Sequence, residues 1–156
     1  MHIRLLAVGD RQPEWVDRAF QSYIERFPRE WRFRLETIAT AKRTKNAPRT
    51  HALEIEGQQL LARISADEHV VLLDERGKQV TSQELATKLS SWQSDGRNLS
   101  FVIGGPDGAA DDCHKRANST WSLSNLTLPH GLARVLFAEQ LYRAWSLLAG
   151  HPYHRN

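Results

Sequence analysis

The segment LSFVIGGPDG, at residues 99–108, is the most informative part of the sequence, because an apolar run meets two glycines, a proline and a third glycine. The run predicts a strand that ends at Gly104. Glycine lets the backbone turn sharply and approach a ligand closely, and ligands of α/β proteins bind outside the carboxyl ends of strands. The same glycines could also form an ordinary tight connection. The segment has neither a GxGxxG pattern nor the lysine of a P-loop, so it does not indicate nucleotide phosphate binding.

Strands and helices alternate on both sides of this segment. Residues 69–73 form a short, continuous apolar strand, typical of a sheet that is covered on both faces. Further strands are expected at residues 2–9 and 33–38, with a brief strand or extended loop within 121–128 and a turn at Gly77. Helices are expected at residues 13–27, 50–65, 82–96, 111–117 and 129–149, with Thr81 or Ser82 as the cap of the third. This alternation predicts an α/β fold with a mainly parallel sheet flanked by helices.

Length and composition favour one globular domain over residues 1–156. Hydrophobic residues make up 40% and charged residues 25% of the chain, which argues against extensive disorder and a coiled coil. The longest aliphatic run, residues 70–73, is far too short for a membrane helix, and the apolar start is too short for a secretory signal. The single cysteine, Cys113, allows no disulfide within the chain and offers a metal only one thiolate. We therefore expect a cytoplasmic protein with no membrane segment and no metal.

The predicted helix at residues 129–149 is apolar around almost its whole circumference. Such a helix must be buried on nearly all sides, and a domain of this size rarely encloses a terminal helix completely. A homodimer that covers the remaining side is the simplest explanation. Glu139 and Arg143 are spaced to form an i,i+4 ion pair on the polar face that remains.

Basic residues gather in two places, although the net charge is only +3. The first cluster contains Arg29, Arg32 and Arg34, and the second contains Lys42, Arg43, Lys45 and Arg49. Either cluster could be a solvated face. Two clusters so close in sequence also favour an anionic partner such as a nucleic acid.

Two further segments could carry chemistry. In WSLSNLTLPH, at residues 121–130, hydroxyl residues alternate with leucines before a helix start, where backbone groups are free to bind a ligand. The tail at residues 151–156 combines Tyr153, His154 and Arg155, which can stack on bases, transfer protons and bind phosphate. It could also be a frayed terminus. It lacks the acidic and thiol residues expected beside histidine in a metal site.

Three motifs in the second half of the chain, taken in their order and spacing, resemble one known family of proteins. IGGPDG, WSLSNLTLPH and ARVLFAEQLYRAWSLLAGHPYHR follow one another as in the RlmH family of SPOUT methyltransferases. The segments VGDRQPEWV, FPRE and AKRTKNA extend the resemblance over essentially the whole chain. The resemblance implies methylation of N3 of a pseudouridine in the large-subunit ribosomal RNA of bacteria. The resemblance implies a C-terminal trefoil knot and a homodimer. Asp107 stands where many relatives carry glutamate, which keeps the charge.

The resemblance also implies a cofactor and site residues. The cofactor is S-adenosyl-L-methionine, bound in the knot. Its binding residues, carried over to this sequence, are Leu73, Gly104, Leu123, Ser124, Asn125, Leu126, Thr127 and Leu128. The catalytic tail motif corresponds to Tyr153, His154 and Arg155. We expect His154 to take the N3 proton of the base, Arg155 to stabilise the developing anion or hold phosphate, and Tyr153 to stack.

The expected substrate is 23S ribosomal RNA, within the large subunit or the whole ribosome. Lys42, Arg43 and Lys45 lie in a polar loop and are the expected RNA contacts. Two alternatives stay open at this point. One is a ribosome-binding factor with the same fold and no chemistry, and the other is a methyltransferase that acts on transfer RNA.

Overall fold

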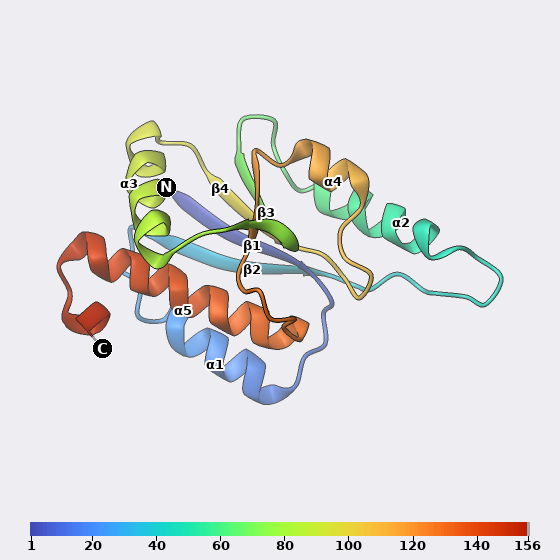
Figure 1. Cartoon of the computed structure of the whole chain (residues 1–156), viewed down its shortest axis with the longest axis horizontal. Coiled ribbons are helices and arrows are strands. Elements are labelled where there is room, and N and C mark those ends of the chain that lie inside the picture. Colours follow the sequence, from blue (N-terminus) through green and yellow to red (C-terminus); the bar gives the residue numbers. More distant parts are fainter. Residues whose placement is uncertain (156) are drawn as a thin grey trace.

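A five-stranded sheet with the order β2-β1-β4-β3-β5 organises the computed structural model, which describes residues 1–155 (Figure 1). The strands are β1 (His2–Val8), β2 (Arg32–Ile38), β3 (His69–Gln79), β4 (Leu99–Ile103) and β5 (Ser119–Ser122). All four strand pairings among these residues are parallel. β4 lies between β1 and β3, and all of its residues are buried. The predicted α/β fold with a mainly parallel sheet is confirmed.

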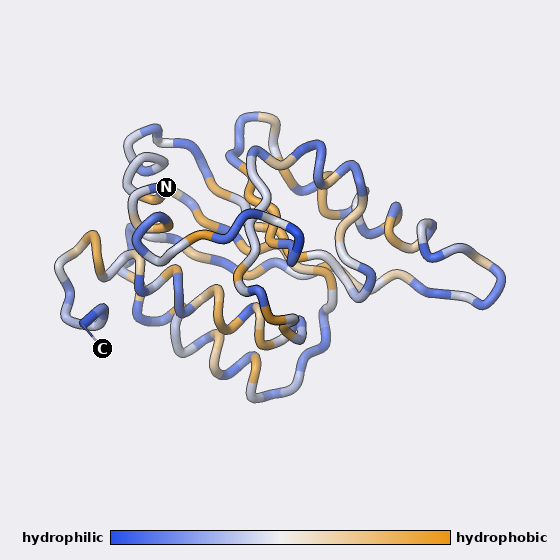
Figure 2. The backbone as a smooth tube through the Cα atoms, viewed as in Figure 1, coloured by the Kyte–Doolittle hydropathy of each residue, from blue (hydrophilic) through white to orange (hydrophobic). Residues whose placement is uncertain are grey.

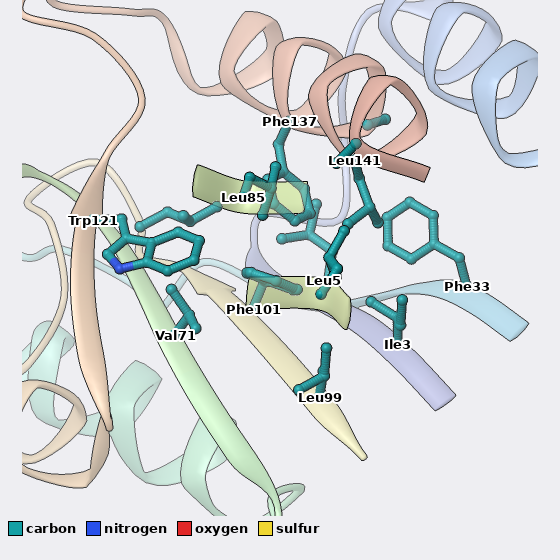
Figure 3. Packing of buried hydrophobic residues seen from close by; sticks show 14 of the residues in the cluster. Ile3, Leu5, Phe33, Val71, Leu85, Leu99, Phe101, Trp121, Phe137 and Leu141 are labelled. Atoms are coloured by element: carbon teal, nitrogen blue, oxygen red, sulfur yellow. The ribbon is translucent and has the colours of Figure 1, made fainter. Parts of the chain in front are cut away.

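Helices cover both faces of the sheet (Figure 1). One layer contains α1 (Glu14–Ile24), α3 (Ser82–Asp95) and α5 (His130–Ala149), and the other contains α2 (Arg49–Leu61) and α4 (Asp111–Arg116). Under the first layer, the ring centroids of Phe101 on β4 and Phe137 on α5 are 4.6 Å apart (Figure 3). Under the second, Leu60 and Cys113 pack against the sheet. β1, β4 and the first half of β3 are therefore largely apolar, as the orange centre of Figure 2 shows.

The predicted helix starts and ends are partly confirmed. Thr81 caps α3, since its hydroxyl accepts from the Glu84 backbone and the Glu84 carboxylate accepts from the Thr81 backbone. Gly96 ends α3 in the left-handed conformation, with φ of 71°. α1 ends at Ile24, three residues before the predicted end, and turns follow as far as Phe27.

β3 is longer than the sequence pattern predicts. The apolar part ends at Leu73, but the strand continues through a shift of register and pairs again at Lys78 with Trp121 of β5. The predicted turn at Gly77 is therefore wrong. A Cβ atom at Gly77 would lie 2.6 Å from the backbone carbon of Trp121, so the two strands approach too closely there for a side chain. Backbone pairing does not require apolar side chains, which is why periodicity missed this extension.

α5 is covered by its own chain more fully than the sequence analysis expected. α1 and α3 pack beside it, and Phe137 and Leu141 are fully buried. Leu132 and Leu148 on this helix remain 38% and 41% exposed. Within residues 1–155, no helix is long and apolar enough to cross a membrane. The homodimer and the trefoil knot stay predictions.

Candidate active site

A cavity of about 650 Å³ opens where the apolar part of β3 ends, beside the carboxyl ends of β4 and β5. Four segments line it: residues 73–76, 103–109 and 122–128, and the first turn of α5. Its volume lies in the range of small-molecule sites, roughly 300–1,000 Å³. Seven of the predicted cofactor residues line this cavity: Leu73, Gly104, Leu123, Ser124, Leu126, Thr127 and Leu128. Asn125 belongs to the same loop but is exposed and does not line it.

The glycine loop after β4 is closed by its own backbone. Gly105 and Gly108 exchange two backbone hydrogen bonds of 3.1 and 3.0 Å. A Cβ atom on Gly104 would lie 2.3 Å from the Gly108 carbonyl oxygen, so only glycine fits at that position. Gly108 has φ of 87°, which favours glycine as well. The loop can therefore present backbone groups to a ligand without side chains in between.

The loop between β5 and α5 forms the apolar side of the cavity. Two hydroxyl bonds shape it: Ser122 Oγ donates to the Ser124 carbonyl at 2.8 Å, and the Leu126 backbone donates to Ser124 Oγ at 2.9 Å. Leu126 in this loop lines the cavity and is 76% exposed. An exposed leucine in a cavity wall is suited to contact a flat, apolar part of a ligand.

His130, the first residue of α5, connects that helix to the glycine loop. Arg134 Nε donates to His130 Nε2 at 2.9 Å, so this nitrogen is an acceptor and the ring proton is on Nδ1. Burial, followed by the positive charge of Arg134, lowers the pKa of His130 to about 4, against a weaker opposing effect of a hydrogen bond to the Gly104 backbone. The ring is therefore neutral near pH 7. It is hydrogen-bonded to the Gly104 backbone and so contacts the glycine loop.

Carboxylates also line the cavity. The Asp74 side chain is only 7% exposed, and it accepts from the Arg76 backbone at 2.9 Å and from Arg76 Nε at 3.2 Å. Burial alone would raise the pKa of Asp74, but the bonds from Arg76 outweigh it and lower the pKa. Sequence reasoning missed Asp74, although its place directly after Leu73, at the end of the apolar run of β3, was a usable signal.

The tail lies at the other end of α5 (Figure 1). It forms the short turn η1 (Pro152–Arg155), in which the Tyr153 ring packs edge-on against Tyr142 at 4.8 Å. Tyr153 also donates a 2.9 Å hydrogen bond to Glu139, so the tail is docked rather than frayed. Among residues 1–155, buried His154 Nδ1 has no hydrogen-bond partner. None of the predicted catalytic residues lines the cavity of the same chain.

The basic loop at residues 39–48 projects beyond the helices and is hydrophilic at its tip (Figure 2). Lys42 and Lys45 are exposed there and free to meet phosphates. Arg43 differs, because its guanidinium bonds to Glu56 at 3.0 Å and to Asp107 at 2.8 Å. In the part of the chain that the structure describes, no three histidine, cysteine or acidic side chains are grouped to hold a metal.

Comparison with known proteins defines the class to which this fold and cavity belong. The family described as "Predicted SPOUT methyltransferase" matches residues 1–154, so the chain belongs to the SPOUT methyltransferases. A search of solved structures adds a probable methylase family protein from Haemophilus influenzae Rd KW20. It has a TM-score of 0.57 and 13% identity, over 99% of this chain and 70% of that one, which supports the fold alone.

A nearer relative defines the group within that class. The chain is 47% identical over 155 residues to the ribosomal RNA large subunit methyltransferase H of Methylococcus capsulatus. The match covers 99% of this chain and 100% of the relative. The chain is thus a member of the RlmH family, as the sequence motifs indicate.

Proposed function

We propose that this protein transfers a methyl group from S-adenosyl-L-methionine to N3 of a pseudouridine in 23S ribosomal RNA. One observation carries the proposal: in a SPOUT chain, seven residues expected to bind the cofactor line one cavity. The name of the Methylococcus relative, a large-subunit ribosomal RNA methyltransferase, supports the substrate class. N3 of pseudouridine is the atom that the family resemblance implies.

The residues of the cavity fit this cofactor. Leu73, Leu126 and Leu128 supply apolar walls for an adenine ring, and the glycine loop offers backbone groups to its polar edge. Asp74 and Asp107 supply negative charge near a cationic ligand. The cofactor, when bound, supplies a methyl group already activated by the positive sulfur. The protein must then align the two reactants and accept one proton.

The tail residues have the chemistry for that proton. We assign His154 as the general base for the N3 proton, Arg155 as the cation that stabilises the developing anion, and Tyr153 as the stacking residue. A helix rises about 1.5 Å per residue, so Glu139, which anchors the tail, lies roughly 13 Å along α5 from His130. The docked tail of one chain therefore acts on the cavity of its partner in a homodimer.

Exposed Lys42 and Lys45 supply charge for the RNA backbone. The substrate is the assembled large subunit or the ribosome in the cytoplasm. Residues 1–156 act as one domain, without a metal.

Methyl transfer to ribosomes from a strain that lacks this protein tests the proposal. Labelled cofactor and nucleoside mass spectrometry should locate the methyl group on N3 of a single pseudouridine of 23S RNA. Labelled transfer RNA would favour a transfer RNA methyltransferase instead. Binding to ribosomes without calorimetric binding of S-adenosylmethionine would favour a non-catalytic ribosome factor.

A further inference from the structure

Arg43 is the centre of a charged network that joins three separate parts of the chain. Its guanidinium bonds to both oxygens of Glu56, at 3.0 and 3.2 Å, and to the Ala41 carbonyl at 2.9 Å. Its Nε donates to Asp107 Oδ2 at 2.8 Å. The network therefore connects the basic loop, α2 and the glycine loop.

Glu56 is the buried end of this network. It is only 2% exposed, and a buried carboxylate is costly unless it is paired and hydrogen-bonded. The Ala41 backbone donates to it at 3.3 Å, in addition to the two bonds from Arg43. A Cβ atom on Gly105 would lie 3.0 Å from Glu56 Oε2, so the carboxylate packs directly against the glycine loop.

Asp107 is the other end, and it lines the cavity. It belongs to the loop that Gly105 and Gly108 close with their two backbone bonds. The guanidinium of Arg43 thus contacts the glycine loop in two ways. It bonds directly to Asp107 of the loop, and it holds Glu56, which packs against Gly105. Planar guanidinium can make such a bridge, whereas the single ammonium of lysine cannot reproduce its fixed geometry.

From this geometry we infer that Arg43 is a positioning residue for the cofactor, which holds the glycine loop in its binding conformation through Glu56 and Asp107. This inference rests on the proposed function, because it takes the cavity to be the cofactor site. It gives Arg43, whose side chain is 25% exposed and paired with Glu56, a task different from that of the exposed Lys42 and Lys45. Three basic residues of one loop are therefore divided between RNA and the cofactor loop.

Calorimetric titration of the full-length protein with S-adenosylmethionine tests the inference. Arg43→Ala should raise the dissociation constant by about tenfold or more, the scale of a lost charge-assisted hydrogen bond. Arg49→Ala is the matched control, because it removes the same charge from a side chain that is 84% exposed and 3.9 Å from the same Asp107. Affinity in this control should stay at the wild-type value.

A second variant separates positioning from folding. Arg43→Ala leaves Glu56 buried and unpaired, so the protein could lose stability. Arg43→Ala with Glu56→Gln removes that charge, and should recover thermal stability without recovering affinity. Wild-type affinity in this folded double variant would overturn the inference.

Two further measurements address the contact itself. Asp107→Ala should also weaken binding of S-adenosylmethionine. Combining it with Arg43→Ala should weaken binding little further, because both changes break the same contact between Arg43 and Asp107; additive losses of affinity would contradict this contact.

Without any cofactor, the Gly108 amide should exchange its hydrogen faster in Arg43→Ala than in Arg49→Ala, as read by NMR. If the wild type binds no S-adenosylmethionine, the proposed function fails as well. If the wild type and Arg43→Ala bind equally, only the role of Arg43 fails.

Discussion

The hydroxyl of Tyr153 donates a 2.9 Å hydrogen bond to Oε1 of Glu139, which also bonds to Arg143 at 2.7 Å. This contact anchors the tail on the side of α5, away from the first turn of the helix, which lines the cavity. The predicted catalytic residues and the predicted cofactor residues of one chain are therefore separated.

Deletion of residues 153–156 should abolish methyl transfer while S-adenosylmethionine still binds, because the tail lies outside the cavity of its own chain. Loss of the Tyr153 contacts should lower the melting temperature by only a few degrees. Mixing these chains with Gly104→Val chains should restore activity in heterodimers that pair one intact tail with one intact cavity. Inactive heterodimers would place the tail outside the partner's site.

Gly104→Ala should eliminate cofactor binding, because its Cβ atom would lie 2.3 Å from the Gly108 carbonyl oxygen and would force the loop to change. Gly96→Ala is the control: it also changes a loop glycine, at φ of 71°, but nothing lies within 4 Å of its new Cβ atom. Both variants can be compared by calorimetry after their folding is checked by circular dichroism. Normal binding to folded Gly104→Ala would remove this residue from the site.

Lys42→Ala combined with Lys45→Ala should weaken binding to ribosomal RNA and flatten its salt dependence. The loss of two phosphate contacts would reduce the slope of log K against log salt by roughly 1.4 to 1.8. Lys88→Ala with Arg97→Ala removes the same charge from another exposed region and should leave the slope unchanged. Equal slopes for the two double variants would make the loop an ordinary solvated face.

Leu132→Glu combined with Leu148→Glu should weaken a homodimer, since both side chains are more than a third exposed on α5 and a buried, unpaired carboxylate is costly. Gln58→Glu with Gln59→Glu adds the same charge to the exposed face of α2 and serves as the control. Light scattering over a dilution series measures the dimer. An unchanged dimer in the first variant would show that the partner covers another face.

Stability should fall as the pH is lowered from about 6.5 to about 4, partly because of His130. Its folded pKa of about 4 lies below the ordinary value of 6.5, so the unfolded chain takes up a proton in this window that the folded chain does not. His130→Asn should make the urea midpoint less dependent on pH between 4.5 and 6.5. The same dependence in wild type and variant would mean that the folded ring titrates normally.

The sequence predicts those features of the fold that depend on residues close to one another in the chain, such as strands and helix starts. The apolar run before Gly104 predicts β4, and the pair Thr81 and Glu84 has the spacing of the capping box that starts α3. It does not predict contacts between distant segments. Nothing in the local pattern joins Arg43 to Asp107, and the second half of β3 is recognised only once β5 lies beside Gly77.

Pairing between strands that are far apart in the sequence also affects how the sheet folds. β1, at the start of the chain, has its central partner in β4, where Ile3 pairs with Leu99. A ribosome must therefore synthesise the chain from β1 through β4 before the middle of the sheet can close. Until then the apolar strands β1 and β3 have no neighbour between them, and parallel pairing of this kind is slow. A newly made chain is thus exposed to aggregation until β4 has been made, so the yield of folded protein should depend on the rate of translation and on chaperones.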